Sequence, residues 1–71
     1  MAESVYKIVE LVGTSTESWE KAESAAVERA AESIRELRIA EVVEQDLQVQ
    51  NGKVVAFRAK VKLSFKYEDA D

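Results

Sequence analysis

The chain has 71 residues, of which 34% are charged, a formal net charge of −4, and neither cysteine nor histidine. This composition excludes disulfides and metal sites built on thiolate or imidazole, it argues against nucleic acid as a partner, and the length allows one domain with a small core. We expect a single domain over residues 1–71 of a cytoplasmic protein with no signal peptide, no membrane span and no membrane partner.

The first half of the chain predicts a strand followed by one long helix. Residues 4–12, SVYKIVELV, are rich in β-branched and aromatic side chains and indicate a strand that Gly13 ends. Residues 16–37 follow a helical period, and Thr14 with Glu17 has the spacing of a capping box. The apolar stripe of this helix is mostly alanine, which lets a helix lie close to its sheet: Trp19, Ala22, Ala26, Ala30, Ile34 and Leu37.

The second half predicts a β-hairpin. Residues 39–50 indicate a strand, and Asn51–Gly52 is typical of a type I′ turn. Residues 53–67 alternate between two faces, one of which is apolar and is expected to meet the helix: Val55, Phe57, Ala59, Val61, Leu63, Phe65 and Tyr67. Residues 68–71 form an acidic tail. The fold class is therefore α+β, a β-α-β-β subunit with a three-stranded antiparallel sheet whose central strand is the third.

The lengths of the predicted elements do not match. A third strand of about 14 residues spans about 46 Å, whereas a helix of about 21 residues spans about 32 Å. The helix therefore leaves part of the apolar face uncovered, a kind of surface that soluble monomers avoid. Together with the small core, this mismatch predicts self-association.

Two carboxylates of the second strand fall at unexpected positions. In the register that a two-residue turn sets, Glu44 lies opposite Ala59. In the same register Asp46 lies opposite Phe57, so both carboxylates point to the apolar face. A β-bulge would move them to the other face, because one extra residue reverses the alternation.

Glu44 and Asp46 are the candidate metal ligands. One strand supplies too few oxygen ligands for a hard cation, so symmetry-related copies, Gln48, carbonyl groups and water would have to complete the site. The alternative is that both carboxylates are solvated or paired with cations of the third strand. These cations form a stripe that is either neutralised by acidic neighbours or available to a phosphate-bearing ligand: Arg58, Lys60, Lys62 and Lys66.

Three stretches of the chain resemble the dodecin family: VYKIVELVGTSTESWEKA at 5–22, the helical segment ERAAESI, and FRAKVKLSFKYED at 57–69. The resemblance covers nearly the whole chain in the same element order. It implies a sheet that wraps one long helix and a hollow homododecameric shell of four trimers. It also implies a non-catalytic protein that binds and stores flavins, such as riboflavin or FMN, at contacts between subunits.

Both flavin positions of the family are substituted in this chain. The resemblance places Ile39 where the family has a tryptophan that stacks on the flavin, and Arg58 where it has a glutamine that hydrogen-bonds the flavin. Isoleucine cannot replace aromatic stacking, which is worth about 1–3 kcal/mol per base. The stretch RIAEVVEQD is similar to a divergent dodecin branch that lacks the tryptophan and is associated with calcium.

Three functions therefore remain open. They are a dodecin shell that stores a small ligand, a flavin-free structural or calcium-binding dodecin, and a protein-interaction module. We expect no catalysis, because the sequence contains no nucleophile–base arrangement, paired carboxylates or Gly-rich phosphate loop.

Overall fold

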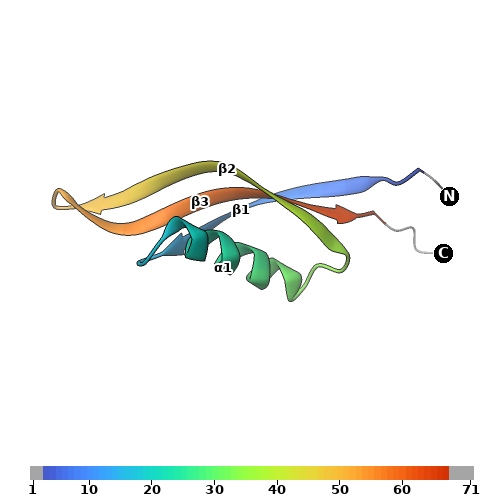
Figure 1. Ribbon diagram of the computed structural model, residues 1–71, viewed down its shortest axis with the longest axis horizontal. Coiled ribbons are helices and arrows are strands. Elements are labelled where there is room, and N and C mark those ends of the chain that lie inside the picture. Colours follow the sequence, from blue (N-terminus) through green and yellow to red (C-terminus); the bar gives the residue numbers. More distant parts are fainter. Residues whose placement is uncertain (1–2, 68–71) are drawn as a thin grey trace.

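The computed structural model describes residues 3–67, so the predicted acidic tail at 68–71 lies outside the described residues. The element order is β1 (Tyr6–Ser15), α1 (Trp19–Ala31), β2 (Leu37–Gln50) and β3 (Lys53–Lys66). Strand β3 lies between β1 and β2 and is antiparallel to both, and α1 packs on one face of the sheet (Figure 1). The predicted fold class and strand order are confirmed.

The hairpin between β2 and β3 turns as predicted. Asn51 has φ 51° and Gly52 has φ 74°, and a type I′ turn requires positive φ at both central residues. Glycine adopts this conformation without a steric penalty, and asparagine tolerates it better than most residues do. The turn therefore sets the pairing of Gln50 with Lys53 at the end of the hairpin.

Helix α1 begins later than predicted. Its N-cap is Ser18, whose hydroxyl oxygen accepts a hydrogen bond from the backbone N–H of Lys21 at 3.0 Å. The predicted capping box of Thr14 and Glu17 is wrong, because β1 continues through Thr14 to Ser15. The Ser15 hydroxyl instead stabilises the turn after β1 by accepting from the N–H of Glu17 at 2.9 Å.

Helix α1 also ends earlier than its apolar period predicts. The helix stops at Ala31, and the N–H of Ile34 bonds to the carbonyl oxygen of Ala30 at 2.8 Å in the turn that follows. Glu36 has φ 61°, a left-handed conformation that costs an L-residue about 1–2 kcal/mol and cannot continue a right-handed helix. The predicted helix over 16–37 is therefore too long, although Ile34 still packs against the core.

The core is a thin layer where the alanine stripe of α1 meets the apolar face of β3. Its buried residues are Ala22, Ala26, Ala30, Ala59, Val61 and Leu63. Partly buried side chains close the layer at its margins: Val9, Val27, Ile34 and Leu37. The small alanine side chains bring helix and sheet close together, as the sequence predicts.

Gly13 lies inside β1 rather than at its end. It pairs with Ala59, and a Cβ atom added to it would lie 2.0 Å from the carbonyl oxygen of Ala22 and 3.1 Å from the Cβ of Ala26. Helix α1 thus crosses β1 at a point where no side chain fits. The prediction that Gly13 ends the strand is wrong, because this glycine permits a close backbone approach instead.

The sheet is much longer than the helix. The 13 residues of α1 span about 20 Å, whereas the 14 residues of β3 span about 46 Å. The molecule measures 53 × 20 × 15 Å. Residues 47–57, the hairpin arm, project beyond the N-terminal end of α1 (Figure 1). The predicted length mismatch is therefore present, and the shorter helix makes it larger.

Candidate functional site on the open face of the sheet

Two β-bulges decide which side chains of β2 face the helix. From Ile39, opposite Ser64, to Val42, opposite Val61, the register is the predicted one, after an irregularity between Leu37 and Ile39 at the start of β2. Val43 is an extra residue that shifts the pairing by one, and Val55 of β3 is a second extra residue that restores it before the turn. Because a shift by one residue turns a strand over, every side chain between the bulges lies on the face opposite to the predicted one.

Glu44 and Asp46 therefore lie on the open face, the face of the sheet that α1 does not cover. Glu44 is opposite Lys60 and Asp46 is opposite Arg58. The placement on the apolar face that an unbroken register predicts is therefore wrong, and the alternative with a β-bulge is the one observed. Without the bulge, the regular strand pairing would place both carboxylates next to the core layer, where an unpaired charge is costly. The bulge brings each of them opposite a cation instead.

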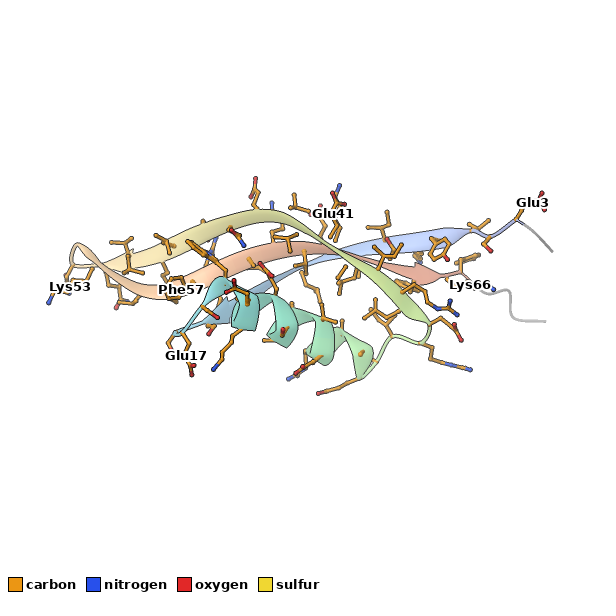
Figure 2. The ribbon with its side chains drawn as sticks, in the orientation of Figure 1. Glu3, Glu17, Glu41, Lys53, Phe57 and Lys66 are labelled. Atoms are coloured by element: carbon orange, nitrogen blue, oxygen red, sulfur yellow. The ribbon has the colours of Figure 1, made fainter. Side chains whose placement is uncertain are left out.

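The segment between the bulges also binds the helix. Gln45 Nε2 donates a hydrogen bond to Glu23 Oε2 at 2.8 Å, and Trp19 Nε1 donates to the backbone carbonyl oxygen of Asp46 at 3.1 Å. The Trp19 ring meets the ring of Phe57 edge to face, with centroids 5.3 Å apart and an interplanar angle of 78°. Figure 2 shows Phe57 beside the first turn of α1. Trp19 thus fixes the start of the helix to the base of the hairpin arm.

Oppositely charged side chains form a charge ladder across the open face. Arg58 donates two hydrogen bonds to the Asp46 carboxylate, from Nε at 2.8 Å and from a terminal nitrogen at 3.0 Å. Lys60 Nζ lies 3.5 Å from a Glu44 oxygen. Lys62 lies opposite Glu41 and 4.0 Å from a Glu10 oxygen, so the ladder consists of Glu10, Glu41, Glu44, Asp46, Arg58, Lys60 and Lys62. The cations of β3 are thereby complemented from both neighbouring strands.

Asp46 and Arg58, the most closely paired residues of the charge ladder, shift each other's pKa. The hydrogen bond from Arg58 holds the pKa of Asp46 below its usual value, and the carboxylate raises the pKa of the Arg58 guanidinium. Both side chains are about half exposed, 45% for Arg58 and 51% for Asp46, so solvent screens their attraction. The pair therefore contributes little to the free energy of unfolding.

One subunit does not by itself supply a calcium site. Glu44 and Asp46 share a face, but each is paired with a cation of β3. Within residues 3–67, no three acidic side chains lie close enough together to hold a metal ion. Since Ca²⁺ takes six to eight oxygen ligands, the residues of a single chain do not fit it, and ligands from further copies would be needed.

Ile39 and Arg58 lie on the same face but far apart. Ile39 is 57% exposed and lies opposite Ser64, next to the exposed Ile8 on the other side of β3. Arg58 lies six residues from Ser64 along β3, about 20 Å at 3.3 Å per residue. The two positions of one subunit cannot enclose a single ring system, so a ligand that touches both would lie between copies.

Comparison with known proteins gives a consistent result. A family model described as Dodecin matches residues 5–68. The calcium dodecin of Mycobacterium tuberculosis is 43% identical over 67 residues, which are 94% of each chain. Its crystal structure matches with a TM-score of 0.82 over 96% of this chain and 97% of that one.

Other solved structures agree. The dodecin of Streptomyces coelicolor is 33% identical, with a TM-score of 0.90 over 99% of this chain and 100% of that one. A variant of the Thermus thermophilus dodecin is 37% identical, with a TM-score of 0.86 over 94% and 100%. In the part of the chain that the structure describes, no helix is long and apolar enough to cross a membrane. This chain belongs to the dodecin family.

Proposed function

We propose that this chain assembles into a hollow homododecameric shell of four trimers, which binds and stores a small ligand without catalysing a reaction. The observation that carries this proposal is the apolar surface that one subunit leaves uncovered. Large side chains that are at least 36% exposed occur on all three strands, among them Ile8, Leu11, Val12, Ile39, Val42, Leu47, Val49 and Val54. A helix of 13 residues cannot cover a sheet of this length, and copies of the same chain would.

Light scattering during size-exclusion chromatography tests the assembly. Twelve copies of the 7.9 kDa chain have a mass of about 95 kDa, and we expect that mass at micromolar chain concentration. A monomer or dimer would overturn the proposal. It would favour the alternative in which the exposed strands bind a different protein.

The ligand site of this proposal lies between copies, on the apolar end of the open face. Ile39 offers a flat aliphatic surface there instead of an aromatic ring, so a flavin would lose about 1–3 kcal/mol of stacking. Titration of riboflavin and of FMN into the protein, followed by flavin fluorescence, measures this directly. Absence of quenching at micromolar protein would remove flavin as the ligand while leaving the shell intact.

Calcium binding is the second candidate function, and the 43% identity to a calcium dodecin favours it. The structure of that relative is described as having a calcium-binding site. Here Glu44 and Asp46 would be the ligands, in exchange for Lys60 and Arg58, with further oxygen ligands from other copies. This candidate predicts that binding competes with the charge ladder.

Calorimetry with Ca²⁺ tests this second candidate. We expect measurable heat for the wild-type assembly, none for Asp46→Ala, and unchanged heat for the control Glu3→Gln, which precedes the start of β1 at Tyr6. Equal heats for wild type and Asp46→Ala would exclude the proposed ligands.

A cytoplasmic location without nucleic-acid or membrane partners is also part of the proposal, and fractionation of cells that express the chain checks it.

A further inference from the structure

An open groove of about 260 Å³ lies between α1 and β2 on the helix side of the sheet. Its floor is apolar and its rim is acidic; it is lined by Val27, Ala40, Val42 and Val61, with Glu23, Ser24 and Glu28 at the rim. The groove exists because α1 packs mainly over β1 and β3 and hardly touches β2. The middle of β2 therefore has an apolar side without cover, and Val42 is 44% exposed.

The described chain has no segment that can fill its own groove. The nearest uncovered apolar surface is the hairpin arm, but Asn51 at its tip lies nine residues from Val42, about 30 Å along the same strand. The arm cannot fold back, because β2 and β3 stay paired up to the turn. Whatever covers the groove must come from another molecule.

The hairpin arm has the complementary chemistry. Leu47, Val49 and Val54 on it are 42%, 57% and 52% exposed. Lys53 lies at its free end, as Figure 2 shows. Among residues 3–67, neither Lys53 nor the rim residue Glu28 has an ion-pair partner within its own chain. The arm therefore offers apolar side chains and one unpaired cation, and the groove offers an apolar floor and one unpaired carboxylate.

A second groove, of about 310 Å³, lies on the other side of the helix, between α1 and β1. Its rim carries Arg29 and no acidic side chain. Arg29 is already paired with Glu32 at 3.9 Å, so this rim offers the lysine at the tip of the arm no unpaired carboxylate, and charge complementarity favours the first groove.

We propose that the hairpin arm of one copy docks into the groove between α1 and β2 of a second copy, with Lys53 facing Glu28. Each copy has one arm and one groove, so the contact is head to tail, and such contacts close into rings when the rotation between copies allows it. This inference rests on the proposed assembly and names the surfaces that hold neighbouring copies together.

Engineered disulfides test the docking directly, because the chain has no cysteine of its own. The variant Ser24→Cys with Gln50→Cys puts one thiol on the groove rim and one near the tip of the arm. After mild oxidation, we expect a series of covalently linked chains on a non-reducing gel, which dithiothreitol reverses. Each single-cysteine variant gives at most a linked dimer, since it has only one thiol.

The matched control pairs the same arm position with the other groove, as Ala25→Cys with Gln50→Cys, since Ala25 of α1 lines that groove. Linked chains from this pair and none from the Ser24 pair would overturn the proposal. An oligomer by light scattering with no linked series from either pair would also overturn it. A wild-type chain that is monomeric by light scattering would instead remove the proposed assembly itself.

Charge reversal provides an independent readout that needs no cross-link. Glu28→Lys and Lys53→Glu should each raise the chain concentration at which the assembly dissociates by about tenfold, and the double variant should return it to within about twofold of wild type. The control is Glu3→Lys, at the opposite end of the molecule from the arm in Figure 2. Equal effects of the double variant and the single variants would contradict the pairing.

Discussion

Asp46 and Arg58 face each other across β2 and β3, and the guanidinium donates two hydrogen bonds of 2.8 and 3.0 Å to the carboxylate. The pair forms only because Val43 is an extra residue that shifts the register between the strands. Without it, Asp46 would lie opposite Phe57 under the start of the helix. One bulge thus converts a buried acid into half of an exposed ion pair, and it leaves the Asp46 carbonyl oxygen as an acceptor for Trp19.

This pair predicts a loss of stability in acid. The pKa of Asp46 is lowered by Arg58 in the folded chain, whereas an unfolded aspartate has a pKa of about 3.9. The pair therefore contributes its stability in full above about pH 5, and the contribution is lost as the pH falls through the folded pKa. Thermal unfolding of wild type and Asp46→Asn at fixed chain concentration should differ most at pH 7, and the difference should shrink as the pH falls below the unfolded pKa and through the lowered folded pKa of Asp46. A difference that stays constant with pH would contradict this.

The close approach of α1 to β1 predicts that Gly13→Ala is strongly destabilising. The new methyl group would overlap the Ala22 carbonyl, and relieving such overlap typically costs about 1–3 kcal/mol or more. Gly52→Ala is the matched control, since no atom lies within 4 Å and only the positive φ opposes it, at about 1–2 kcal/mol. Denaturant unfolding at equal chain concentration should rank Gly13→Ala as the less stable variant, and the reverse order would contradict the close contact between helix and strand.

The edge-to-face rings of Trp19 and Phe57 predict a favourable coupling energy. Pairs of this geometry contribute about 0.5–1.5 kcal/mol beyond the area they bury. A double-mutant cycle with Trp19→Leu and Phe57→Leu measures that coupling in the free energy of unfolding. Trp19→Leu also removes the hydrogen bond to Asp46, so it should cost more alone than Phe57→Leu. Additive effects of the two substitutions would show that the rings do not interact.

Replacing Ile39 by tryptophan is expected to increase the affinity for riboflavin. Ile39→Trp places an aromatic ring on the exposed apolar end of the open face and should strengthen riboflavin binding by at least about tenfold, the equivalent of about 1.4 kcal/mol of stacking. Ile39→Leu is the control and should leave affinity unchanged. Fluorescence titration of both variants measures the effect. If the tryptophan variant binds no better than the leucine variant, this end of the sheet is not the ligand site.

Regular patterns in the sequence were sufficient for the architecture. The alternation over residues 53–67 and the Asn51–Gly52 turn specify a hairpin, and the alanine stripe specifies a helix that lies close to the sheet. These features depend on local periodicity and turn chemistry, so they can be inferred without knowing any tertiary contact.

The errors occurred where tertiary contacts override the local pattern. Ile34 keeps the apolar period of the helix although the chain has already left it, because a turn residue can fill the core as well as a helical one does. Gly13 is ambiguous, since glycine can end a strand or admit a close neighbour. The bulge at Val43 has no signature of its own. Its only trace in the sequence is that a regular pairing of β2 with β3 would place Glu44 and Asp46 on the apolar face.

The extra residues Val43 and Val55 lie on opposite strands of one hairpin, so each cancels the other before the turn is reached. Deleting only one of them would leave the strands out of step at Asn51–Gly52 and force a loop of different length. Deleting both would give a straight ribbon with two acids beneath the helix. Length changes in this hairpin are therefore expected to occur in pairs, one on each strand, over the course of the family's divergence.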